Sequence, residues 1–307
     1  MTALRKAWDW LALEPHQRKG LRALQICLGL MLLFRASTEL RFAAYLYGPH
    51  GIGDGSSREF VGPLARYLDL VYASDASVYL LVALMGTAAL GLVFGSSTRL
   101  ATAAALGTFL LLEARLPLLL DGGDNVTRLV LTYMLFALPA SAQPRKGSLA
   151  VWIHNVAILA IGLQIGVVYL TSGFLKATGE KWSNGTAMYL ISQVEWFSHP
   201  ALRGLFKDPF ITTLASYATV FFQIWFPVAV LTRLRPLWLA IGISFHIGIA
   251  VFMGLICFSL AMIGLELFLL HDDEYERMGA WLARRGAWLR GRLRLPASQP
   301  VEGSCRV

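Results

Sequence analysis

The chain has 307 residues, of which 56% are hydrophobic and 15% are charged, and its mean hydropathy is +0.57. A soluble domain usually holds about 25% charged and about 45–50% apolar residues. The apolar excess therefore excludes an ordinary soluble domain and predicts a chain embedded in a bilayer. The formal net charge is +8. Because the basic residues lie at the ends of apolar runs, this charge indicates topology signals and lipid contact, and we do not expect nucleic-acid binding.

The apolar runs are long and rich in Leu, Ala and Ile, which is typical of helices and unlike the alternating segments of a β-barrel. We predict an all-α, polytopic transmembrane bundle of about eight helices, each near 20 residues. The stretch from Leu237 to Leu270 is too long for one crossing, and Met253-Gly254 offers a break. The predicted ranges are 21–40, 78–94, 100–120, 126–138, 151–175, 210–231, 237–253 and 254–270.

The basic residues predict the orientation of the bundle, because Lys and Arg gather in cytoplasmic loops. With eight crossings the basic segments at 18–22, 99, 145–146, 233–235 and 277–294 all fall on one side. Seven crossings would place the arginine-rich tail on the other side. We therefore predict that both termini are cytoplasmic and that the chain lies in the inner (cytoplasmic) membrane. The predicted parts are an N-terminal segment at 1–20, a transmembrane domain at 21–270 and a cytoplasmic tail at 271–307.

The segments outside the predicted crossings carry three further expectations. Residues 1–20 mix charges without a small-residue cleavage site, so we expect no cleavable signal peptide. The longer segments at 41–77 and 176–209 are predicted to lie on the outer side. The tail from Glu276 to Leu295 sets Trp281 and Trp288 among arginines and predicts a basic amphipathic helix on the inner surface. A frayed, solvated tail is the alternative.

Ionisable groups inside a bilayer are costly unless they pair or face a cavity, so their depth is informative. Nearly all of them fall in the outer half of the predicted bundle. This placement predicts a polar cavity that opens outward and is lined by several helices. The candidate residues are Arg35, Glu39, Glu113, Arg115, Asp121, Asp124, Arg128, Tyr169, Lys176, Gln223 and His246.

These residues also have structural interpretations. Arg35 and Glu39, four positions apart, can simply join two turns of one helix. The arginines at 115 and 128 can neutralise nearby carboxylates without any chemistry. His246 can be a packed histidine bonded to a neighbouring helix, and Lys176 can reach the lipid headgroups from a helix end.

The glycines of Asp121-Gly-Gly-Asp124 predict a tight turn. The two aspartates are too few to specify a metal, so no metal site is predicted. The sequence contains no Walker or dinucleotide motif, no HExxH and no GxSxG.

Two segments carry a family resemblance. One runs Tyr169-Leu-Thr-Ser-Gly-Phe-Leu-Lys176 and continues through Lys181-Trp182-Ser-Asn-Gly-Thr-Ala187; the other begins Ser244-Phe-His-Ile-Gly and runs on to Phe258. They resemble the HTTM family, which comprises the membrane domain of the vitamin K-dependent γ-glutamyl carboxylase and its bacterial relatives. The resemblance extends from about residue 20 to residue 270. The Asp-Gly-Gly-Asp turn and the Trp-x-x-Gly-Thr-Ala loop look most similar to a bacterial SdpB-like branch.

The resemblance implies roles for individual residues. In the carboxylase, a lysine in the matching motif is the base that deprotonates vitamin K hydroquinone, so Lys176 is implied to be catalytic. His246 lies on the helix that matches the family's histidine helix and is the second candidate. Trp182 joins the predicted cavity through the matching loop. On this basis we expect that Lys176→Ala abolishes activity while the protein still inserts.

Three hypotheses about function remain open. The first is an SdpB-like factor for maturation or export of a secreted peptide of the antimicrobial or toxin type. Its partners would be membrane lipid, a peptide precursor and a small partner protein. The second is a quinone-dependent epoxidase or carboxylase-like enzyme with a quinone or hydroquinone cofactor, in which Arg128 or His246 stabilises an oxyanion. The third is a non-catalytic membrane scaffold or immunity protein.

Overall fold

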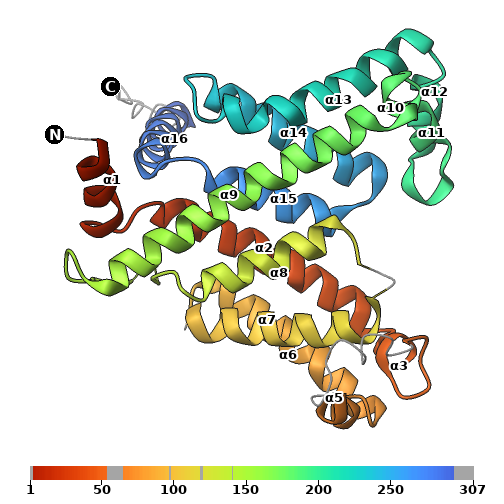
Figure 1. Ribbon diagram of the computed structural model, residues 1–307, viewed down its shortest axis with the longest axis horizontal. Helices are drawn as coiled ribbons and strands as arrows, with labels where there is room; N and C mark the ends of the chain where they lie inside the picture. Colours follow the sequence, from red (N-terminus) through yellow and green to blue (C-terminus); the bar gives the residue numbers. More distant parts are fainter. Residues whose placement is uncertain (1–2, 54–64, 97, 118–119, 140, 294–307) are drawn as a thin grey trace, which may run out of the picture.

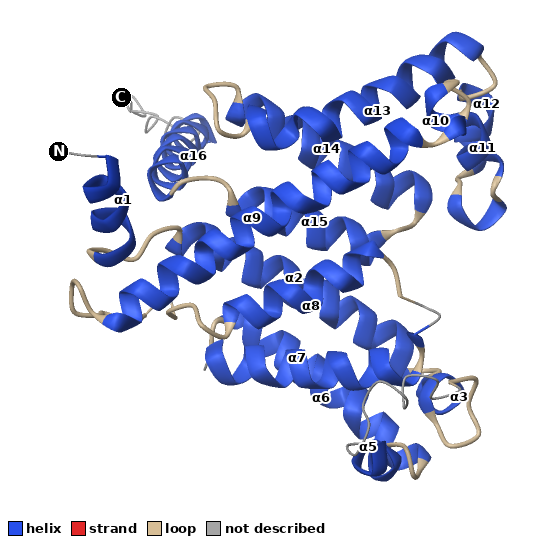
Figure 2. Cartoon of the chain, viewed as in Figure 1, coloured by secondary structure: helices blue, strands red, loops and turns tan. Residues whose placement is uncertain are grey.

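The computed structural model describes residues 3–53, 65–96, 98–117, 120–139 and 141–293, and within these ranges the chain forms only helices and loops (Figures 1 and 2). The predicted all-helical architecture is therefore confirmed for this part of the chain. A helix is found at each predicted crossing. These helices are α2 (Arg18–Leu40), α6 (Asp75–Phe94), α7 (Thr98–Arg115), α8 (Gly122–Met134), α9 (Leu149–Thr178), α13 (Pro209–Ala229), α14 (Arg235–Met253) and α15 (Ile256–Phe268).

Shorter helices occupy the segments between and before these. They are α1 (Ala3–Ala12), α3 (Ala43–Tyr47), α5 (Ala65–Val71), α10 (Glu180–Ser183), α11 (Ala187–Gln193), a 3₁₀ turn at Glu195–Phe197 and α12 (Pro200–Leu205). The predicted tail helix is present as α16 (Asp272–Leu293) and begins four residues earlier than predicted. The residues after 293 lie outside the described ranges.

Five helices of the described chain are long and apolar enough to cross a membrane, namely α2, α6, α9, α13 and α14. The others fall short for identifiable reasons. α15 is apolar but has only 13 residues, α8 also has 13, and α7 carries Arg99, Glu113 and Arg115. The apolar helices fit a membrane protein. The total of eight crossings stays a prediction.

Two boundaries differ from the predicted ones because of local chemistry. α7 ends at Arg115 instead of residue 120, because Pro117 has no N–H and disfavours helical backbone before it. α8 begins at Gly122, so the predicted glycine turn is wrong. The Asp121 carboxylate accepts hydrogen bonds from the N–H groups of Gly123 and Asp124, and the Asp124 carboxylate accepts from Asp121 N–H at 3.0 Å. This capping box makes the glycine pair the first turn of a helix.

The predicted break between the last two crossings is confirmed. Gly254 has φ +71°, a left-handed backbone conformation that ends α14 and that residues with a side chain rarely adopt. The break is tied to an earlier loop, because His199 N–H donates to the Phe252 carbonyl at 2.8 Å.

The basic segments gather at one end of the bundle, which we call the basic end. The backbone N–H groups of Arg18 and Lys19 donate to Asp272 at 3.1 and 2.8 Å, so the tail caps α2. The Arg22 guanidinium donates to the carbonyls of Leu92 and Val93 at the end of α6. α1 and α16 both lie at this end, and α3 and α10–α12 lie at the other, which we call the opposite end (Figure 1).

Two further contacts extend the basic end to the remaining loops. Lys146 pairs with Glu14, and Arg235 Nη2 lies 2.8 Å from Glu274 Oε1. These contacts support the prediction that the basic segments share one side. That this side is the cytoplasm stays a prediction.

Candidate functional site

Arg35 on α2 is the centre of a buried ion-pair cluster, which we call the arginine cluster. Its Nε lies 2.6 Å from Glu39 Oε1, and its Nη1 lies 2.5 Å from Asp124 Oδ1 on α8. The guanidinium carbon is 5.1 Å from the centre of the Phe109 ring on α7. The Arg35 and Asp124 side chains are only 10% and 9% exposed. One guanidinium therefore joins three helices through charge pairs and a cation–π contact.

The predicted pairing of Glu113 with Arg128 is present but loose. Arg128 Nη1 lies 3.7 Å from Glu113 Oε2, and the arginine side chain is 42% exposed whereas the glutamate is 5% exposed. Neither carboxylate oxygen of Glu113 accepts a hydrogen bond from a described residue, and the same holds for Glu39 Oε2 and the Tyr47 hydroxyl. Buried polar atoms without partners carry a desolvation cost. This region therefore keeps open hydrogen-bonding capacity next to the arginine cluster.

Arg115 and Asp121 have structural partners. Arg115 donates to the carbonyls of Tyr47 and Gly48 at 3.2 and 2.8 Å, and it lies over the Tyr72 ring at 5.2 Å. It thus holds the end of α3, and no contact with Glu113 is found among the described residues. Asp121 is the cap of α8.

A second buried group lies between α9, α14 and α15, and we call it the Tyr–His–Glu cluster. The Tyr169 hydroxyl is 3.0 Å from His246 Nε2 and donates to Glu266 Oε1. His246 Nε2 and Glu266 Oε1 are 3.6 Å apart. None of the three residues is more than 1% exposed. The Tyr169 ring is fixed by stacking on Phe226, with ring centres 3.8 Å apart.

The hydrogen bonds of this cluster leave specific atoms open. Because the Tyr169 hydroxyl donates to Glu266, it can accept from His246 only if Nε2 carries the proton, which leaves His246 Nδ1 with a free lone pair. Within the cluster, His246 Nδ1 and Glu266 Oε2 are buried without a hydrogen-bond partner among the described residues. Gln223 Oε1 on α13 and Ser259 Oγ on α15 are buried without a partner as well, but in the described part of the chain no contact joins them to the cluster. An imidazole, a phenol and a carboxylate that are joined by hydrogen bonds can transfer a proton from one to the next or bind a small polar group.

Sequence reasoning selected Tyr169, His246 and Gln223 but missed Glu266. A usable signal was present, because Glu266 is the single charged residue between Arg235 and His271 and an ionisable group in such a run is costly. The fold makes room for it with Gly242. A Cβ at that position would overlap the Glu266 carboxylate and lie 2.8 Å from its Cδ.

We expect opposite effects from two alanine substitutions on α14. Gly242→Ala should lower the free energy of unfolding by about 1–3 kcal/mol, because the added methyl displaces Glu266. A Cβ at Gly248 meets nothing within 4 Å. Gly248→Ala should therefore raise the free energy of unfolding by up to about 1 kcal/mol, because alanine has the higher helix propensity. Unfolding of the detergent-purified variants, followed by tryptophan fluorescence, measures both. Equal effects at the two sites would contradict the close packing of Gly242 on Glu266.

Lys176 lies apart from the Tyr–His–Glu cluster. Its Nζ donates to Ser172 Oγ at 2.6 Å and lies 5.3 Å from the centre of the Trp182 ring. It follows Tyr169 by two turns of α9, or about 10 Å. Among the described residues, no hydrogen bond, ion pair or ring contact joins it to His246. The structure thus brings Lys176 and Trp182 together, Tyr169 and His246 together, and Arg35, Glu39 and Asp124 together, as separate groups.

Comparison with known proteins finds partial similarity to two proteins of Bacillus subtilis (strain 168). The chain is 25% identical to YitO over 164 residues, which are 48% of this chain and 53% of YitO. It is 27% identical to the sporulation-delaying protein SdpB over 128 residues, which are 39% of each chain. The matches thus span about half or less of these relatives.

No family model matches the chain, and no solved structure matches it. The similarity to SdpB supports an SdpB-like relationship. The HTTM resemblance stays an interpretation of the sequence.

Proposed function

We propose that this chain is an SdpB-like, HTTM-type protein of the cytoplasmic membrane that acts in the maturation or export of a secreted peptide. The observation that carries the proposal is the buried Tyr–His–Glu cluster with its open polar atoms. The partial similarity to the sporulation-delaying protein SdpB supports it.

The proposed topology has about eight crossings and places the basic end in the cytoplasm, because Lys and Arg concentrate in cytoplasmic loops. Lys176 and the arginine cluster then lie toward the outer surface. Tyr169 and His246 lie in the halves of α9 and α14 nearer the opposite end. A peptide precursor held at the outer half of the membrane would thus lie at the depth of these groups.

The physical argument for activity is that this cluster lowers the stability of the bundle. Burying an imidazole and a carboxylate without full hydrogen bonding lowers stability, and a bilayer raises that cost. Such a group in an apolar bundle is by default a functional-site hypothesis. His246 Nδ1 and Glu266 Oε2 offer an acceptor pair to a polar group of the peptide.

The test is to express the chain together with a neighbouring gene for a short secreted peptide and to measure the mature peptide in the medium by mass spectrometry. Mature peptide that appears only with the chain supports the proposal. Equal amounts of mature peptide without the chain would exclude it.

Lys176→Ala tests the predicted role of the lysine in the same assay. We expect the mature peptide to be lost while the variant remains in the membrane at normal amount, because alanine removes the ammonium that lies on Trp182. Lys181→Ala, at an exposed position on α10, is the matched control and should leave the yield unchanged. Full yield with Lys176→Ala would remove the lysine from the mechanism.

One contact favours the quinone-dependent enzyme as the second candidate. The Lys176 ammonium beside the half-buried Trp182 indole forms an aromatic and basic corner on which a quinone ring can stack. Mass spectrometry of the lipophilic extract from detergent-purified protein tests this. A quinone present in the wild type and lost in Lys176→Ala supports the enzyme, and no quinone in either supports the peptide proposal.

A further inference from the structure

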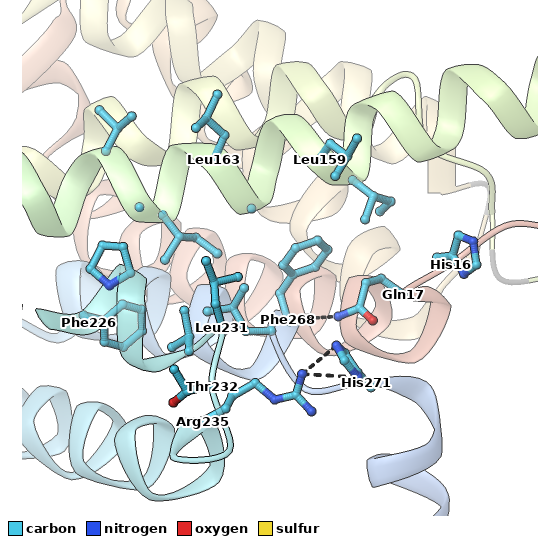
Figure 3. A pocket seen from close by; sticks show the side chains of 18 of the residues that line it. His16, Gln17, Leu159, Leu163, Phe226, Leu231, Thr232, Arg235, Phe268 and His271 are labelled. Atoms are coloured by element: carbon cyan, nitrogen blue, oxygen red, sulfur yellow. Dashed lines mark hydrogen bonds between the residues drawn. The ribbon is translucent and has the colours of Figure 1, made fainter. Parts of the chain in front are cut away.

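A large cavity begins at the basic end and extends along α9 to Phe226, the ring that stacks on Tyr169. Its volume is about 1280 Å³, and it lies between α9, the end of α13 and the start of α16. Leu159 and Leu163 on α9, Phe226 on α13 and Leu231 just after α13 line the cavity (Figure 3). Drug-sized ligand sites measure about 300–1,000 Å³, so the cavity has room for a larger amphiphile.

The length of the cavity matches one leaflet of a bilayer. Its wall on α9 runs from Ile158 to Leu170, which is about 18 Å at roughly 1.5 Å per residue. Half of a hydrocarbon core of about 30 Å is about 15 Å. The polar lining residues lie on the segments that form the basic end, among them Gln17, Arg235 and His271. The cavity thus has an apolar shaft as deep as a leaflet and a polar mouth.

The two acidic residues at the mouth already have hydrogen-bond partners. Asp272 accepts the backbone N–H groups of Arg18 and Lys19. Asp273 accepts from Arg277 Nη2 at 2.7 Å. Arg277 thus balances the charge of Asp273, whereas Asp272 keeps its negative charge in a position fixed by the backbone of α2.

The basic residues at the mouth keep free capacity. Arg235 uses Nη2 on Glu274 at 2.8 Å and Nη1 on His271 at 2.6 Å, but its buried Nε has no hydrogen-bond partner among the described residues. Arg233 lines the cavity and is exposed. In the described part of the chain, the Arg233 side chain forms no ion pair and no hydrogen bond. The mouth thus offers one exposed arginine and one unpaired buried donor.

We propose that this cavity binds one anionic phospholipid. An acyl chain lies between α9 and α13, and the phosphate accepts from Arg235 Nε and pairs with Arg233. Arginine is well suited to phosphate because its N–H groups form a planar fork. A basic pocket between helices at a membrane surface has the charge and shape that an anionic headgroup requires.

Two variants test the shaft and the mouth separately. The full chain is incubated in mixed micelles with equal phosphatidylglycerol and phosphatidylcholine, repurified, and analysed for bound lipid by mass spectrometry. Gly162 lines the shaft, and a Cβ there meets nothing within 4 Å, so Gly162→Leu projects a side chain into the space and should abolish retention of both lipids. Arg233→Gln should lower the ratio of bound phosphatidylglycerol to phosphatidylcholine about fivefold.

Each variant has a matched control. Gly107→Leu is also on a helix with nothing within 4 Å of the added Cβ, and Gly107 does not line the cavity. Arg99→Gln removes an exposed arginine from the start of α7. Both controls should retain wild-type lipid. Equal retention in wild type and Gly162→Leu would overturn the site, and a phosphatidylglycerol preference that survives Arg233→Gln would overturn the assigned headgroup contact.

A neutral lipid or quinone that Gly162→Leu displaces and Arg233→Gln does not affect would also overturn the proposal. Thermal unfolding of each variant shows whether the bundle is intact. Because Arg233 is exposed, its variant keeps the test valid even if the leucine at 162 disturbs the packing of α9. The result is independent of any secreted peptide, so it stands or falls separately from the proposed function.

Discussion

Replacing Arg35 with methionine should lower the free energy of unfolding by about 3–5 kcal/mol. The guanidinium pairs with Glu39 at 2.6 Å and with Asp124 at 2.5 Å. Methionine fills similar space but leaves two carboxylates that are only 15% and 9% exposed without a cation. Removing one partner of a buried pair is costly because the remaining charge stays desolvated. Unfolding of the detergent-purified chain in a denaturant series measures the loss.

Arg128→Met is the matched control on the neighbouring pair. Arg128 is 42% exposed and lies 3.7 Å from a single carboxylate, that of Glu113, so its loss should cost less than the loss of Arg35, which leaves two carboxylates without a cation. Adding Asp124→Asn to Arg35→Met removes one orphan charge and should recover part of the stability. Equal costs for Arg35→Met and Arg128→Met would show that the arginine cluster is hydrated, and the account of a dry ion pair would then be wrong.

His246→Gln is expected to reduce the mature peptide in the medium by about 100-fold, with the variant still present in the membrane. This expectation rests on the proposed function. Glutamine can keep a hydrogen bond to the Tyr169 hydroxyl but cannot exchange a proton between two ring nitrogens, and proton transfer by a positioned side chain contributes about 10²–10⁴-fold. The readout is peptide yield divided by the amount of membrane-inserted protein.

His154→Gln is the control, because His154 is also fully buried but has no open ring nitrogen. Its Nδ1 accepts from Leu138 N–H at 3.0 Å, and its Nε2 lies 2.9 Å from the His16 carbonyl. We expect this variant to lose stability and to keep its peptide yield per inserted protein. If both variants lose only stability, the Tyr–His–Glu cluster is structural and the scaffold hypothesis survives.

Much of the fold could be predicted from hydrophobic runs and charge placement. The split at Gly254 followed from the length of one apolar stretch, and the shared side of the basic segments followed from counting crossings. The start of α8 could not be predicted in this way, because the capping of Gly122-Gly123 by Asp121 and Asp124 depends on side-chain geometry. The runs likewise predicted long crossings but gave no sign of the short helices at the opposite end.

The candidate site was harder to predict for a different reason. Sequence gives the depth of a residue along its helix but not the helix that it faces. Arg35 was correctly paired with Glu39, four positions on, whereas its bond to Asp124 joins residues 89 positions apart. Lys176 and His246 were both assigned to one predicted cavity, yet the structure gives them different partners.

The first and last apolar helices of the described bundle are neighbours. Gly264 of α15 lies against Leu24 and Cys27 of α2, where a Cβ would come within 2.7 Å of Cys27. The Gln17 amide donates to the Phe268 carbonyl across 251 positions of sequence. During synthesis, the face of α2 that packs on α15 therefore has no α15 to contact until nearly the whole chain has emerged. Lipid or a chaperone must cover that face in the meantime. A chain interrupted before α15 should be a target for membrane quality control, because its first helix still lacks that partner.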